Sequence, residues 1–343
     1  MDRAREKTAA LAAAGTAAAA AAGVGLKRFR HRDDAQFDSD SYRFLSGEPV
    51  GAGIKRVVVA RVDDAVASLR GEAGAGPAEA VHEARKDIKK TRSALRLVRD
   101  AVGDDVWRLE NEHYRDCARK LSAFRDAEIL VEALDALGER FGPPARERSA
   151  RLRDELDREN RAAYDDGSVE RVMATVAAEL EQARTRVQSL PLHGDGWDLI
   201  EPGLRRSYRR GRKRLRDVEE VAAATNLHEL RKRVKDVWYQ LRLIGDADPD
   251  LLGQVADQAH DLSDHLGDDH DLALLREQVQ RRAEAFAEPG DQRHLLEEID
   301  QRRGELQFAA LSLGRRIYDE KPKKFAKRLE RRWEAWRARE PVP

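Results

Sequence analysis

The chain contains the same helix-like segment twice, and this repeat limits the fold to one that is built from two related halves. VHEARKDIKKTRSALRLV begins at Val81 and LHELRKRVKDVWYQLRLI begins at Leu227, so the two segments align at an offset of 146 residues. His82 then meets His228, and the bases and apolar residues that follow each histidine coincide. Self-similarity of this kind indicates a tandem duplication.

Two further blocks, in the same order, support the duplication. LSAFRDAEIL from Leu121 aligns with LGDDHDLALL from Leu266 at an offset of 145, and GIKR from Gly53 resembles GLRR from Gly203. Each half then holds about 140 residues, a size that suits a four-helix bundle. The predicted halves are residues 47–190 and 197–335.

Helical periodicity dominates the sequence from about residue 47 onward. Leu, Ala, Arg and Glu are frequent, and the only β-branched run is Val57 to Val59. The sequence therefore predicts an all-α protein of antiparallel helices. Glycine and proline breakers divide it at Gly71 to Pro77, Gly142 to Pro144, Pro191 to Gly196, Pro249, Gly253, Pro289-Gly290 and Pro322.

The repeated segment has one basic face. At 100° per residue, the basic residues Arg85, Lys86, Lys89 and Arg96 fall within about 60° of His82. We call these four residues, together with His82, the first stripe. The second stripe is its counterpart on the other copy: His228, Arg231, Lys232, Lys235 and Arg242. Apolar residues occupy the opposite side and should face the core: Ala84, Ile88, Leu95 and Val98 in the first copy, and Leu230, Val234, Leu241 and Ile244 in the second.

Carboxylates are absent from both stripes, although like charges one turn apart cost about 0.2 to 0.5 kcal/mol per pair. A single basic stripe is commonly a solvated helix face, but its preservation in both copies favours a binding role. Arginine and lysine stripes that repeat every turn suit a polymeric anion, because guanidinium groups bind phosphate through paired hydrogen bonds. Two such stripes facing each other would line one continuous groove.

GLRRSYRRGRKRLR, from Gly203, concentrates the positive charge further, since eight of its fourteen residues are basic and none is acidic. Arg205, Arg209, Arg212 and Arg216 form one line along a helix, while Leu204, Tyr208 and Leu215 form another that should pack inward. A third basic run, KPKKFAKRLERR from Lys321, could belong to the same surface or be a solvated terminal helix.

Overall composition sets limits on function. Lys plus Arg equals Asp plus Glu, at 64 of each, which argues against a generic nucleic-acid coat and makes local segregation of charge the informative feature. Cys117 is the only cysteine, so a disulfide framework within the chain is excluded and a cytoplasmic setting fits.

LHELRKRVKDVWYQLRLI, with GLRRSYRRGRKRL before it and LGDDHDLALL after it, resembles the CHAD family, the conserved-histidine α-helical domain. VHEARKDIKKTRSALRLV and LSAFRDAEIL carry the same resemblance in the first half, and it covers roughly residues 47–335. It implies two pseudo-symmetric four-helix bundles around a basic central pore or groove that binds inorganic polyphosphate. It also implies a non-catalytic binding or targeting module without a cofactor or metal, in the cytoplasm, with polyphosphate-metabolising enzymes or granules as further partners.

The resemblance implies that the family's binding positions carry over to basic residues of this chain. In the first half, Arg125 matches the basic position of an Arg-Asp motif that becomes His270 and Asp271 in the second. Positions aligned with Arg209 and Arg212 are apolar in the first half, so Lys55 and Arg56, with Arg61 as a further candidate, should serve there. The predicted polyphosphate-binding residues are Lys55, Arg56, His82, Arg85, Lys86, Lys89, Arg96, Arg119, Lys120, Arg125, Arg205, Arg206, Arg209, Arg212, Lys213, His228, Arg231, Lys232, Lys235, Arg242 and Lys324.

Two other functions compete with this one. His82 and His228 could join the segment from His265 to Asp271 in a metal site or a metal-dependent phosphate-processing site, but the bases around His82 disfavour a divalent cation. Nucleic acid could bind to the same basic side chains. However, few aromatic residues lie among these side chains to stack on nucleobases. Motifs of nucleophilic or phosphate-loop enzymes do not occur.

Residues 1–46 differ from the rest of the chain. Residues 8–25 are uncharged and rich in alanine, with bases on both sides, and residues 31–46 are polar and read as a linker. This segment could be a membrane anchor or a signal-like segment, or it could be a low-complexity tail or a surface helix. The weak hydrophobicity of alanine favours the tail or surface helix. Any membrane contact is expected only through this tail.

Overall fold

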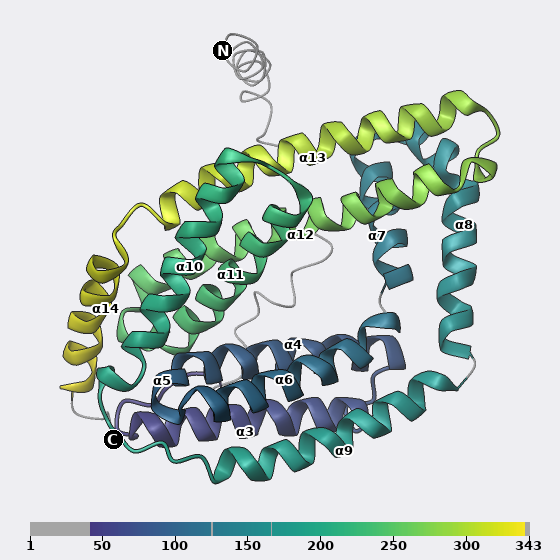
Figure 1. The fold of residues 1–343 in the computed structure, drawn as a ribbon. Coiled ribbons are helices and arrows are strands. Elements are labelled where there is room, and N and C mark those ends of the chain that lie inside the picture. The colour runs from purple at the N-terminus through teal and green to yellow at the C-terminus, as the bar shows by residue number, and fades with distance from the viewer. Residues whose placement is uncertain (1–41, 125, 166, 340–343) are drawn as a thin grey trace. The chain divides into compact units, whose positions relative to one another are not determined.

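The computed structural model describes residues 42–124, 126–165 and 167–339, and its secondary structure within them is entirely helical (Figure 1). This confirms the predicted all-α class. The α-helices are α3 (Val50–Leu69), α4 (Pro77–Leu97), α5 (Arg99–Val102), α6 (Asp104–Lys120), α7 (Asp126–Phe141), α8 (Pro143–Asp165), α9 (Ser168–Gln188), α10 (Glu201–Glu220), α11 (Ala224–Leu243), α12 (Pro249–Arg281), α13 (Pro289–Ile317) and α14 (Pro322–Arg337). Short 3-10 helices are η1 (Ser122–Phe124), η2 (Trp197–Leu199), η3 (Gly245–Ala247) and η4 (Ala283–Ala285).

Proline and glycine set most of the helix boundaries. Pro249, Pro289 and Pro322 each stand in the first turn of a helix, where a missing N–H costs nothing. Gly253 was expected to break a helix, but it lies inside α12. A single interior glycine costs only about 1 kcal/mol, and burial of Leu252 and Ala256 on either side of it offsets that cost.

Helices of the first half pack around α3. α3 lies between α4 and α9, and α6 contacts both α4 and α9 (Figure 1). In the second half α11 lies between α10 and α12, and α12 also contacts α13. The predicted inward faces of the repeated helix are confirmed, since all eight apolar residues of the two copies are buried.

The apolar core is shared between the halves. Its larger cluster runs through α3, α4, α10 and α11 and includes Ile54, Leu97 and Leu243. A smaller cluster joins α7 and α8, from the first half, to α12 and α13 through residues such as Leu134 and Leu275. Each half therefore depends on the other for burial of its apolar surface.

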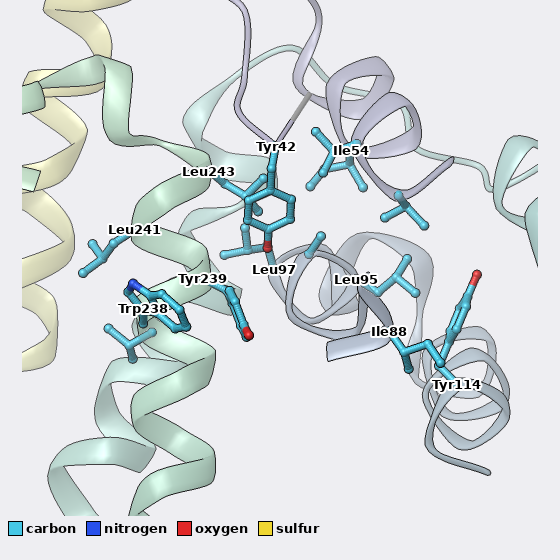
Figure 2. Packing of buried hydrophobic residues seen from close by; sticks show 14 of the residues in the cluster. Tyr42, Ile54, Ile88, Leu95, Leu97, Tyr114, Trp238, Tyr239, Leu241 and Leu243 are labelled. Carbon is cyan, nitrogen blue, oxygen red and sulfur yellow. The ribbon is translucent and has the colours of Figure 1, made fainter. Parts of the chain in front are cut away.

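The two copies of the repeated helix contact each other directly. Ser93 of α4 donates a hydrogen bond to the carbonyl of Asp236 on α11 at 3.0 Å, and the Gln240 amide donates to the Ser93 carbonyl at 3.3 Å. Tyr42 packs at this contact, with its ring edge toward Tyr239 (Figure 2). The C-terminal parts of α4 and α11 thus fix the position of the two basic stripes.

No helix within the described residues is long and apolar enough to cross a lipid bilayer. The alanine-rich segment at residues 8–25 lies outside those residues.

Candidate functional site

Arg85 in the first stripe forms hydrogen bonds with residues at the C-terminal end of α6 and just after it. Its Nη1 donates to the Ala118 carbonyl at 2.7 Å and to the Ser122 hydroxyl. His82 and Lys89 lie half-buried on the same face of α4. This half of the repeat therefore holds its central arginine with internal hydrogen bonds.

Arg231 in the second stripe has a different neighbour at the equivalent place. Gly267 is the residue of the second half that aligns with Ser122 of the first half. A Cβ on Gly267 would come within 3.1 Å of Arg231 Nη2. Glycine supplies no hydroxyl, and Arg231 Nε is buried without a hydrogen-bond partner among the described residues. The second stripe thus presents a guanidinium with unused donor capacity.

Two histidines lie beside Arg231. The rings of His228 and His270 are 4.4 Å apart between centroids, and His270 occupies the position of Arg125, which lies outside the described residues. Burial first, and then the charges of His270, Lys232 and Arg231, lower the pKa of His228 from 6.5 to about 4. The pKa of His270 is also lowered, by burial first and then by Arg231. A proton is unfavourable on either histidine because burial, and then the neighbouring positive charges, oppose it.

Aromatic rings support the far end of the second stripe. The Lys235 ammonium lies 5.5 Å from the centre of the Trp238 ring, and the Arg242 guanidinium lies 5.5 Å from the same ring. Trp238 stacks in turn on His260, at 4.5 Å between centroids. These contacts restrain long side chains that would otherwise lose more conformational entropy on binding a ligand.

The stripes hold no carboxylate of their own, but acids beside them pair with some of their lysines. Lys86 pairs with Glu83 at 3.1 Å, and Lys232 pairs with Glu229 at 2.7 Å. Residues three apart on a helix are neighbours, so an acid on the flank reaches the lysine beside it. The repeat has kept this pair in both copies.

Most other predicted bases have partners inside the protein. Lys55 donates to the Gln188 carbonyl at 3.1 Å, and Arg212 donates to the Tyr318 carbonyl at 3.0 Å. Arg209 and Lys213 are exposed on α10. Carboxylates pair with the remaining ones: Arg56 with Glu48, Arg61 with Asp64 and Asp87, Arg96 with Asp236, Arg119 with Asp116, Lys120 with Glu179, Arg205 with Glu201, Arg206 with Asp100 and Lys324 with Glu320.

Sequence reasoning missed four arginines that the structure places near Arg96 and Arg206. They are Arg92, Arg99, Arg210 and Arg233. A signal for Arg210 was available on α10, where the small residues Gly203, Ser207 and Gly211 recur at helical spacing and are all buried. Small residues at this spacing mark a face that another helix approaches closely, and Arg210 borders that face.

The acidic and histidine-rich segment of α12 has structural partners. Asp269 accepts hydrogen bonds from Arg303 at 3.1 Å and from Gln307 at 2.7 Å. Among the residues that the structure describes, no group of three or more His, Cys, Asp or Glu is arranged to hold a metal ion.

Comparison with known proteins relates the chain to a protein family and to a solved structure. The family model described as "CHAD domain" matches residues 56–280. A crystal structure of the CHAD domain from the plant Ricinus communis is similar at 19% sequence identity and a TM-score of 0.47, covering 81% of this chain and 92% of that one. No curated protein matches the chain.

Proposed function

The chain belongs to the CHAD domain family, and we propose that it binds inorganic polyphosphate through the two basic stripes without catalysing a reaction on it. In this proposal the halves act as two pseudo-symmetric four-helix bundles, and their stripes line a shared basic groove. Binding would take place in the cytoplasm, where polyphosphate-metabolising enzymes or granules are the expected further partners.

One observation carries the proposal. Arg231 keeps a buried Nε without a hydrogen-bond partner among the described residues, beside two histidines whose pKa values are lowered. A buried donor without an acceptor is costly, at about 1 to 3 kcal/mol, unless a ligand satisfies it. A phosphate oxygen is a suitable acceptor because it forms strong charge-assisted hydrogen bonds with a guanidinium.

Burial of the nearby aromatic residues favours polyphosphate over nucleic acid. Trp238 and Tyr239 are only 2% and 1% exposed, and Trp238 already stacks on His260. Their faces are therefore not available to stack on nucleobases, which single-strand binding proteins normally require. A ligand made only of phosphate groups does not need them.

The test is a titration of the full chain with long-chain polyphosphate at two salt concentrations, with RNA as a competitor. Polyphosphate should bind more weakly at high salt because binding releases counterions, and RNA in equal phosphate concentration should displace little of it. Efficient displacement by RNA would assign the stripes to nucleic acid instead.

A further inference from the structure

Six arginines from four helices interact electrostatically around the place where α4, α10 and α11 pack together. On α11, Arg233 points about 160° away from Arg231 around the helix axis, so this group is separate from the second stripe. Gly203 allows the close approach, since a Cβ there would lie 2.1 Å from the Leu97 carbonyl oxygen. The arginine cluster consists of Arg92 and Arg96 on α4, Arg99 on α5, Arg206 and Arg210 on α10, and Arg233 on α11.

The carboxylates in the cluster do not balance its charge. Asp236 pairs with both Arg96 and Arg233, the latter at 2.9 Å. The other two acids are Asp100, which pairs with Arg206, and Asp104, which pairs with Arg99 at 2.8 Å. Among the described residues the six guanidinium groups thus form ion pairs with three carboxylates, and Glu229, whose pKa Arg233 helps to lower, is a further acid nearby.

Arg210 has no carboxylate partner in the arginine cluster. It makes no ion pair with any residue that the structure describes, and the charges of Arg233, Arg96, Arg99 and Arg206 all lower its pKa after burial. Burial and the charge of Arg96 likewise lower the pKa of Arg92 to about 10. Mutual repulsion of this kind destabilises the protein unless an anion neutralises it.

Unused hydrogen-bond donors lie in the same place. Arg206 Nη1 and Arg96 Nε are buried and have no acceptor among the described residues. Asn111 adds a polar group, since its Oδ1 accepts from Arg92 at 3.2 and 3.1 Å. The side chains of Arg206 and Arg233 are each 18% exposed, so solvent reaches the edge of the cluster.

We propose that the arginine cluster is a second anion site, which binds one compact tetrahedral oxyanion of the phosphate class between α4, α10 and α11. The ligand is a phosphate group, either free orthophosphate or one group of a longer chain, because convergent guanidinium forks match its oxygens. This site is separate from the second stripe, and it shares Arg96 with the C-terminal end of the first stripe.

Replacing Arg210 tests the site without removing an ion pair. In the wild type, orthophosphate should raise the melting temperature above that in chloride at equal ionic strength. Arg210→Gln should melt about 1 to 2 °C higher in chloride, because repulsion is relieved, and should lose the phosphate-specific rise. The affinity for orthophosphate should fall about tenfold or more by calorimetry. Arg316→Gln is the matched control, since Arg316 is exposed on α13, and it should behave as the wild type does.

An unchanged phosphate-specific rise in Arg210→Gln would overturn the proposal. A second arm titrates long-chain polyphosphate into the same variants. Weaker polyphosphate binding in Arg210→Gln identifies the ligand as part of a chain, and unchanged binding identifies it as free phosphate. The wild type could fail to bind polyphosphate and still show the rise in melting temperature with orthophosphate. That result would contradict the proposed function and support the anion site at the arginine cluster.

Discussion

The guanidinium of Arg231 lies directly against Gly267, and this contact distinguishes the two halves of the duplication. Arg85, the counterpart of Arg231, donates to the hydroxyl of Ser122, the counterpart of Gly267. In the second half no hydroxyl competes for the arginine, whose Nε has no partner among the described residues. One residue difference on α12 therefore leaves a buried guanidinium donor of Arg231 unused.

Gly267→Ser should weaken polyphosphate binding about fivefold, because the new hydroxyl gives Arg231 an internal acceptor worth about 1 kcal/mol. Isothermal titration calorimetry measures the change. Gly253→Ser is the matched control, since Gly253 lies in the same helix with open space around it, and it should bind as the wild type does. Equal affinities in the two variants would show that the Gly267 contact does not matter for binding.

Asp236→Asn should destabilise the fold strongly. Asp236 and Arg96 are 8% and 7% exposed, and the substitution leaves Arg96 and Arg233 without their shared carboxylate. Breaking a buried pair of this kind costs about 3 to 5 kcal/mol, which urea denaturation can measure. Asp116→Asn, at the exposed pairs with Arg115 and Arg119, should cost much less, because solvent screens the charges there. Similar losses in both variants would contradict this account.

The low pKa of His228 predicts a loss of stability in acid. The unfolded chain takes up a proton near the ordinary value of 6.5, whereas the folded protein holds His228 neutral down to about 4. The contribution of His228 is therefore complete above about pH 6.5 and falls as the pH drops toward 4. His228→Gln cannot take up this proton, so its melting temperature should fall less between pH 6.5 and 4.5. Parallel curves for the two proteins would show that His228 does not titrate in this way.

The sequence predicted the helix faces well and the ion pairs poorly. Ala84 and Ile88 on α4 are buried as expected, because helical periodicity is a local property that the sequence displays directly. Pairing of Arg96 with Asp236 depends on how α4 meets α11, and no local pattern records that contact. For the same reason the sequence did not show that Arg92 on α4 and Arg233 on α11 share acceptors with Arg96.

The central claim concerns the second stripe, and a triple variant tests it. Arg231, Lys232 and Lys235 are replaced together by alanine. The control removes the same number of positive charges from exposed positions on α9 and α13, at Arg171, Arg293 and Arg316. Circular dichroism and thermal melting establish that both proteins are folded.

The measurement is the dissociation constant for long-chain polyphosphate, compared between the two triple variants at low and high salt. The stripe variant should lose about a hundredfold in affinity and show a smaller dependence on salt, while the control should stay within a few-fold of the wild type. Wild-type affinity in the folded stripe variant would contradict the assignment of polyphosphate binding to this surface.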